Sequence, residues 1–150
     1  MGEITNILTA AQQRAKASEA HYAGILLPIE AHHLMQLVPS ARLVDVRSRA
    51  ERDFVGFVPN SLHIEWQHYP TWTLNQNFYA ELRQQVDPEA LALFICRSAH
   101  RSHLAAIAAT RAGYSNCYNI AEGFEGERDL LTGQRGKNGW KVAGLPWIQN

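Results

Sequence analysis

The segment "LALFICRSAHRSHLAAIAATRAGY", residues 91–114, decides the fold of this chain. Its first residues are apolar up to Cys96, which is typical of a central strand that is buried on both faces of a parallel sheet. A short polar loop follows, and a helical pattern then runs to Gly113, a residue that favours helix ends. The helix is expected to face the core with Leu104, Ile107 and Ala108.

Shorter segments on both sides of this stretch repeat the alternation of strand and helix. In "LVDVRSRAERDF", a short buried strand is followed by Ser48, which is expected to cap a helix carrying Glu51 and Phe54. Short strands that alternate with helices predict an α/β fold around a parallel sheet. The expected strands are residues 25–27, 43–46, 62–64, 91–96 and 116–120, and the expected helices are residues 5–22, 30–38, 49–54, 76–86 and 100–113.

Length and composition bound the kind of protein. A chain of 150 residues suits one domain, which we divide into a helical extension, residues 1–23, and a globular part, residues 24–150. The formal net charge is zero, from 14 basic and 14 acidic residues, so no global field attracts nucleic acid or an anionic membrane. The N-terminal residues do not resemble a secretory signal, and two cysteines do not make a disulfide framework. A reducing cytoplasm is the expected compartment.

Cys96 occupies the junction between the central strand and the next helix. Ligands of open parallel sheets bind beyond the C-terminal ends of the strands, where a helix N-terminus supplies free N–H groups and a positive dipole end. Arg97 and Arg101 add positive charge. We therefore expect the pKa of Cys96 to lie below the ordinary value of about 8.5 and its sulfur to act as a nucleophile. Cys117, inside "NCYNI", has no cation or helix start beside it and is expected to be a structural thiol.

The other histidines and the aromatic residues carry weaker patterns. Five histidines match no standard spacing of zinc ligands, so no metal site is expected. They are His32, His33, His63, His68 and His103. Trp66, Tyr69 and Trp72 form an aromatic cluster that either lines a pocket near the cysteine or packs into the core.

Five segments, in the order of the chain, carry a resemblance to a known family. The loop "CRSAHRS", residues 96–102, resembles the active-site loop Cys-Arg-Ser-Gly-x-Arg-Ser of the rhodanese-homology domains. "LVDVRSRAERDF" is similar to the family's Asp-Val-Arg segment, and "GFVPNSLHI" to its Gly-His-Ile-Pro-Gly-Ala turn. "AGYSNCYNIAEGFEG" is similar to its Gly-Phe-x-x-Val-x-x-Leu-x-Gly-Gly segment, and "NGWKVAGLPW" to its closing Trp-x-x-x-Gly-x-Pro. The resemblance covers about residues 24–147, and its ending looks like that of single-domain rhodaneses of bacteria.

The resemblance implies both a fold and an activity. The implied fold is an open parallel sheet of about five short strands with helices on both faces. The implied activity is sulfur transfer, in which Cys96 takes the outer sulfur of thiosulfate or of a persulfide donor and passes it to cyanide or to a thiol. The expected partners are a small sulfur-containing anion or low-molecular-weight persulfide and a protein thiol, but neither nucleic acid nor a membrane. No cofactor is implied beyond the covalent cysteine persulfide.

The resemblance also implies roles within the loop. Arg97 is the candidate for binding the oxyanion of the donor, and the backbone N–H groups from Arg97 to Ser102 would hold the persulfide. Ser98 and Ser102 either donate to the persulfide or cap the helix. His100 either faces the pocket or is solvated. Arg101 either binds substrate or pairs with a carboxylate and braces the loop.

Residues outside the loop are expected to support it. These loop-supporting residues are Asp45, Arg47 and Glu51. Asp45 or Glu51 is the expected carboxylate partner of Arg101. The chain also departs from the family pattern twice. Ala99 stands where the loop usually has glycine, and alanine costs about 1 kcal/mol or more if that position needs a positive φ. Phe57 replaces the usual histidine of the turn, which we interpret as a structural change.

Two other classes of function compete with sulfur transfer. Cysteine phosphatases and arsenate reductases of related fold use a Cys-x5-Arg loop, whereas Cys96 and Arg101 have the shorter Cys-x4-Arg spacing. The shorter loop makes a smaller cradle, which suits sulfur better than a tetrahedral phosphate. The second alternative is a non-catalytic binding module, or a carrier that passes persulfide sulfur to a protein. The presence of Cys96 argues against the non-catalytic class, but the sequence does not separate a carrier from a free-standing enzyme.

Overall fold

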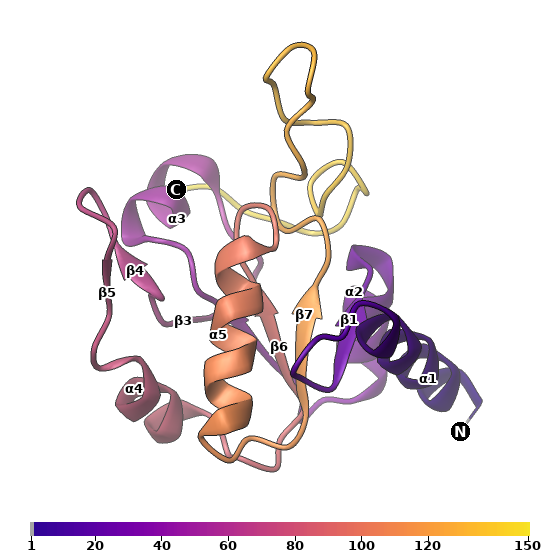
Figure 1. Cartoon of the computed structure of the whole chain (residues 1–150). Helices are drawn as coiled ribbons and strands as arrows, with labels where there is room; N and C mark the ends of the chain where they lie inside the picture. Colours follow the sequence, from indigo (N-terminus) through magenta and orange to yellow (C-terminus); the bar gives the residue numbers. More distant parts are fainter. Residues whose placement is uncertain (1) are drawn as a thin grey trace.

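A computed structural model of the chain describes residues 2–150 and shows a five-stranded sheet with helices on both faces (Figure 1). The strand order is β1-β7-β6-β2-β3, and every neighbouring pair is parallel. The strands are β1 Gly24–Leu26, β2 Arg42–Asp45, β3 Leu62–His63, β6 Ala92–Ile95 and β7 Cys117–Ile120. A separate antiparallel hairpin consists of β4 Gln67–His68 and β5 Thr73–Leu74.

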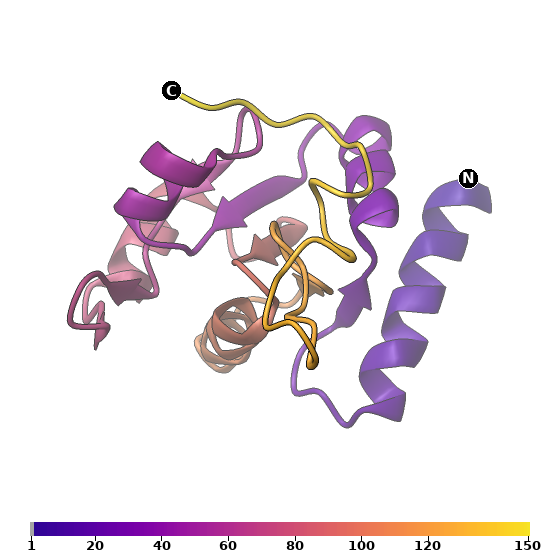
Figure 2. The same ribbon diagram turned by 90° about the horizontal axis from the view of Figure 1, so that it is seen from above.

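Helices lie on both faces of the sheet, which Figure 2 shows from above. They are α1 Gly2–Ala17, α2 Pro28–Leu37, α3 Arg49–Val55, α4 Phe78–Gln85 and α5 His100–Arg111. Apolar residues of α4 and α5 pack in one core cluster, and those of α1 and α2 pack in the other. This architecture confirms the expected α/β fold. No helix within residues 2–150 has both the length and the apolar character needed to cross a membrane.

β6 is the central strand, and all four of its residues are buried. Successive side chains of a strand point to opposite faces, so Leu93 and Ile95 pack with α1 and α2 while Phe94 and Cys96 pack with α4 and α5. Phe94 is paired in register with Asn119 of β7. The same alternation therefore directs Cys96 and Asn119 to the face covered by α5.

α5 differs from the expected helix in the face that it buries. Leu104 was expected to face the core, but it is 38% exposed, so that prediction is wrong. Ala105, Ala106 and Ala109 are buried in its place, between the helix and the sheet. Small side chains let the helix axis approach the strands closely, and a leucine at these positions would hold the helix away.

α1 lies alongside β1 and buries Ala11 and Ala15 against the domain (Figure 2). A Cβ on Gly24 would lie 2.5 Å from the ring of Tyr118 and 3.0 Å from the backbone of Ala11, so the glycine permits this packing. The sequence predicted that this helix ends at residue 22, but in the structure it ends at Ala17. Met1, which we assigned to the helical extension, lies outside the described residues.

Candidate active site

Cys96 lies where the chain leaves β6 and enters the loop before α5. The residue is 1% exposed and lies in the wall of a pocket of about 340 Å³. The hydroxyl of Ser102, in the first turn of α5, lies 3.3 Å from Sγ, at hydrogen-bond distance. The lining residues of this pocket are Gln67, Trp72, Cys96, Arg97, Ser98, His100 and Arg101. The structure thus brings most of the residues singled out in the loop together around one opening.

Ala99 is the residue immediately before α5, and its backbone is left-handed, with φ +80° and ψ −7°. In this region the Cβ of an L-residue crowds the following carbonyl oxygen, a conflict that glycine does not have. The position therefore does require the positive φ that we considered from the sequence. The strain is local to the turn that wraps the chain around Cys96.

Ala99→Gly is expected to raise the free energy of unfolding by about 1 kcal/mol, because glycine adopts the left-handed conformation without this conflict. The measurement is the urea midpoint of unfolding at an unchanged m-value. Ala112→Gly is the matched control, because Ala112 ends the same helix at φ −87° and should lose stability when its side chain is removed. An unchanged or lower midpoint for Ala99→Gly would show that the loop does not strain its alanine.

The segment after β7 holds the loop from the other side. The amide of Phe124 donates to the carbonyl of Cys96 at 2.8 Å, and the amide of Glu125 donates to the carbonyl of Arg97 at 3.0 Å. Gly123 has φ +70°, and a Cβ there would lie 2.6 Å from the carbonyl carbon and oxygen of Arg97. Glycine at position 123 is what allows the two backbones to approach so closely.

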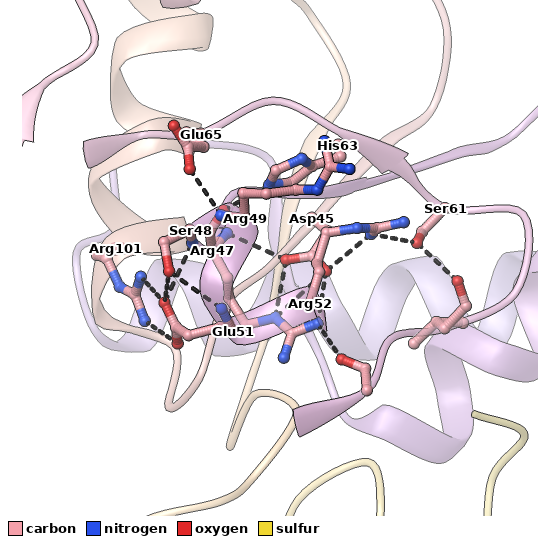
Figure 3. Close-up of polar contacts among 12 residues, drawn as sticks. Asp45, Arg47, Ser48, Arg49, Glu51, Arg52, Ser61, His63, Glu65 and Arg101 are labelled. Carbon is pink, nitrogen blue, oxygen red and sulfur yellow. Dashed lines mark hydrogen bonds and ion pairs between the residues drawn. The ribbon is translucent and has the colours of Figure 1, made fainter. Parts of the chain in front are cut away.

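Arg101 forms a bidentate ion pair with Glu51, as Figure 3 shows. Nη1 donates to Oε1 at 2.7 Å and Nη2 donates to Oε2 at 2.8 Å. The amide and hydroxyl of Ser48, the residue that caps α3, lie 3.1 and 3.0 Å from the same Oε1. Of the two roles considered for Arg101, the structure shows the carboxylate pair, and the partner is Glu51 rather than Asp45. The pair connects the first turns of α3 and α5.

The surroundings of this pair keep both side chains charged. Burial alone would raise the pKa of Glu51, but the hydrogen bonds and charge of Arg101 and the bonds from Ser48 outweigh burial and lower the pKa to about 2. Burial alone would likewise lower the pKa of Arg101, but Glu51 raises it. The positive charge of Arg101 is therefore matched by Glu51 within the protein.

Asp45 and Arg47 form a second, fully buried ion pair. Asp45 accepts from Nη2 of Arg47 at 2.7 Å and from Nη1 of Arg52 at 3.0 Å (Figure 3). Arg47 is fully buried, and its guanidinium carbon lies 4.3 Å from the ring centre of Phe124. Phe124 in turn donates to the carbonyl of Cys96. The structure therefore links Asp45 and Arg47 to the loop through Phe124 rather than by direct contact.

The mouth of the pocket carries unpaired positive charge. Arg97 and His100 are exposed there, and Ser98 is half-buried. Within residues 2–150, the Arg97 guanidinium makes no hydrogen bond or ion pair that would neutralise it. Arg135, which we did not select from the sequence, lines another pocket, and burial and then the charge of Arg97 lower its pKa. The entrance therefore suits an anion.

The aromatic cluster is divided between the pocket and the core. Trp72, beside the β4–β5 hairpin, lines the pocket, and the guanidinium carbon of Arg101 lies 5.2 Å from its ring centre. Tyr69 packs edge-to-face on Trp72 with ring centres 5.6 Å apart and is exposed. Trp66 instead packs against Phe78 in the core. Of the two roles considered from the sequence, Trp72 therefore lines the pocket and Trp66 packs in the core.

Cys117 has the surroundings of a structural thiol. It is fully buried in β7, and burial raises its pKa to about 11. A thiol with such a pKa stays protonated and is a poor nucleophile. Within residues 2–150, no group of three or more histidine, cysteine, aspartate or glutamate side chains is placed to hold a metal ion.

Sequence reasoning missed residues that contact the loop from β7 and beyond. Asn119 donates to the carbonyl of Ala99 at 3.2 Å and accepts from Ser102 at 2.6 Å. Its signal in the sequence was a polar residue inside an otherwise apolar strand. Gly123 lies in the segment that resembles the family's Gly-Gly ending, but its contact with the backbone of Arg97, 26 positions earlier, is visible only in the structure.

Comparison with known proteins places the chain in a family. The model of the rhodanese-like domain matches residues 29–128. A protein of Rickettsia rickettsii, named "Uncharacterized protein RP600 homolog", is 38% identical over 110 residues, which are 72% of this chain and 83% of the relative. The crystal structure of Rv0390 from M. tuberculosis is similar with a TM-score of 0.78 and 41% identity, over 86% of this chain and 99% of that one.

A more distant structure shares the fold. The polysulfide-sulfur transferase homodimer of Wolinella succinogenes has a TM-score of 0.60 at 22% identity, over 93% of this chain and 87% of that one. The sequence resemblance, the family match and these structures agree with one another. The chain described here therefore belongs to the family of proteins with a rhodanese-like domain.

Proposed function

We propose that this protein is a sulfurtransferase that carries sulfane sulfur on Cys96. The observation that carries the proposal is the place of Cys96 directly after β6, in a pocket that Arg97 and the first residues of α5 also line. Membership of the rhodanese-like family supports it, and so does the fold shared with a protein named as a polysulfide-sulfur transferase.

The reaction that we propose has two displacement steps. The Cys96 thiolate attacks the outer sulfur of thiosulfate, an S–S bond forms, and the bond between the two donor sulfurs breaks so that sulfite leaves with its electron pair. An acceptor nucleophile, cyanide or a thiolate, then attacks the outer sulfur of the persulfide and releases the Cys96 thiolate. Backbone N–H groups of the loop and the dipole of α5 stabilise the negative sulfur in both steps.

The pocket indicates which groups would bind the donor. Because Glu51 neutralises Arg101, Arg97 is the proposed partner of the donor's oxyanion. A low-molecular-weight persulfide would use the same entrance, with Trp72 as an apolar wall for its carbon chain. We propose a thiol, including a protein thiol, as the natural acceptor, and a reducing cytoplasm as the compartment in which that thiol remains available.

The test is the intact mass of the reduced protein after incubation with thiosulfate and removal of small molecules. We expect the wild-type chain and Cys117→Ser to gain one sulfur atom and Cys96→Ser to gain none. Cys117 is the matched control, because it is equally buried but lies inside β7, where burial raises its pKa. If the wild-type chain gains no sulfur from thiosulfate or from glutathione persulfide, sulfur transfer through Cys96 is ruled out.

A further inference from the structure

A buried chain of polar side chains contacts the loop from β7 and α5. Asn119 of β7 is 5% exposed, and Ser102 of α5 is fully buried. Oδ1 of Asn119 accepts from the hydroxyl of Ser102 at 2.6 Å, and Nδ2 donates to the carbonyl of Ala99 at 3.2 Å. A single side chain thus holds both the residue that turns the loop and the hydroxyl that lies beside Cys96.

The orientation of the Asn119 amide is determined by what surrounds it. Its nitrogen faces the carbonyl of Ala99, which can only accept, so the reverse orientation would place two acceptors together, whereas the hydroxyl of Ser102 can pair with either end of the amide. Tyr22, which precedes the residues matched by the family model, supports this orientation from farther away. Its hydroxyl lies 3.5 Å from Nδ2 of Asn119 and 2.7 Å from Nδ1 of His103.

A polar residue in this position is costly unless it has a function in the fold. β7 is buried along its whole length, and a buried amide without partners is destabilising. Here both polar ends of the amide are used, and both partners belong to the segment that surrounds Cys96. Ala99 is also the one residue of that segment held at a positive φ. Asn119 therefore contacts the carbonyl of Ala99, the residue whose left-handed conformation turns the loop.

We propose that Asn119 is a positioning residue that clamps the carbonyl of Ala99 and so keeps the loop around Cys96 in its left-handed conformation. Alanine does not favour this conformation by itself, so the clamp supplies what a glycine would supply through its own flexibility. The clamp concerns the shape of the loop and can be tested without sulfur transfer. Its effect on catalysis rests on the function proposed above.

The proposal makes Ala99 and Asn119 energetically coupled. Without the Asn119 amide, an alanine at position 99 should leave the left-handed region, and the backbone of the loop after Cys96 should lose its present shape. With glycine at position 99, the same loss should matter less, because glycine keeps the conformation unaided. Non-additivity of the two substitutions is therefore the expected signature of a clamp.

The experiment is a double-mutant cycle of Ala99→Gly and Asn119→Ala, made in the full chain. Amide hydrogen exchange of residues 96–102 reports the loop, and single-turnover formation of the Cys96 persulfide with thiosulfate reports the chemistry. Asn119→Ala is expected to speed amide exchange in the loop. It should also slow persulfide formation at saturating thiosulfate by about tenfold and leave the half-saturating thiosulfate concentration little changed. In the Ala99→Gly background the same substitution should slow the rate by less than about threefold.

Asn116→Ala is the control, because Asn116 lies just before β7, bonds to the carbonyl of Glu89 and has no contact with the loop. It should change neither readout. Equal losses from Asn119→Ala in both backgrounds, or no change in loop exchange, would overturn the clamp. If the wild-type chain forms no persulfide, the proposed function fails, while the exchange data still decide whether Asn119 holds the loop.

Discussion

Replacing Gly123 by alanine is expected to destabilise the protein by about 3 kcal/mol, because two separate penalties act at this position. The residue has φ +70°, where a Cβ is strained, and that Cβ would also lie 2.6 Å from the backbone of Arg97 and 2.7 Å from the carbonyl oxygen of Cys96. Backbone cannot rotate away as a side chain can, so the loop itself must move. A shift of about 1 Å in the position of Cys96 should slow persulfide formation by about a hundredfold.

Gly113→Ala separates the two penalties in this prediction. Gly113 has φ +110°, but nothing lies within 4 Å of a Cβ placed there, so only the conformational strain of about 1–2 kcal/mol applies. Urea unfolding and single-turnover persulfide formation are the measurements for both variants. Gly123→Ala could prove no less stable than Gly113→Ala and form the persulfide at the wild-type rate. In that case the close contact between the backbones of Gly123 and Arg97 does not determine the conformation of the loop.

The second large effect is expected for Glu51→Gln, which keeps the shape of the side chain and removes its charge. Arg101 would then be a buried cation without a matching charge, at 13% exposure, and we expect a loss of about 2–3 kcal/mol. The first turn of α5 would keep at most one of its two hydrogen bonds to residue 51 of α3, so sulfur acceptance by Cys96 should slow as well. Urea unfolding and the mass experiment measure the two effects.

The effect of Glu51→Gln should also depend on pH in a defined direction. The folded pKa of Glu51 is about 2, below the ordinary value of 4.5, so its charge stabilises the folded state fully above about pH 4.5. That contribution is lost as the pH falls from about 4.5 toward 2. The stability difference between the wild-type chain and the variant should therefore shrink over this range.

Glu30→Gln is the matched control for this pair. Glu30 makes a similar bidentate pair with Arg14, but the two side chains are 21% and 33% exposed, so solvent screens them more. We expect a loss of less than about 1 kcal/mol there and a rate of persulfide formation equal to that of the wild-type chain. A Glu51→Gln variant that behaves like Glu30→Gln would show that the brace between α3 and α5 is dispensable.

Some features could be predicted because they depend on residues that are close together in the sequence. The apolar run of residues 91–96 and the helix after it identify the central βα unit without any knowledge of the rest. Ser48 was identified as a helix cap from its position alone, and the structure confirms it. The usual glycine of the family at position 99 raised the question of a positive φ there, and the structure shows φ +80°.

Other features could not be predicted because they depend on distances across the fold. Arg101 had two acceptable carboxylate partners in the sequence, and the separation of α3 from α5 determines that Glu51 is the one. The periodicity of α5 suggested that Leu104 is buried, but the short distance between helix and sheet selects alanines for the buried face. Periodicity identifies which residues share a face, but not how close the neighbouring layer comes.

The sequence alone determined the class of fold, the central strand and helix, and the cysteine on which the chemistry is proposed to occur, since each depends on a local pattern of side chains. Only the tertiary structure decided what holds that cysteine in place. Gly123, Asn119 and Glu51 each act on the loop from another element, through a close backbone approach, a buried amide and an ion pair. Such contacts depend on geometry across the sheet, which local sequence does not record.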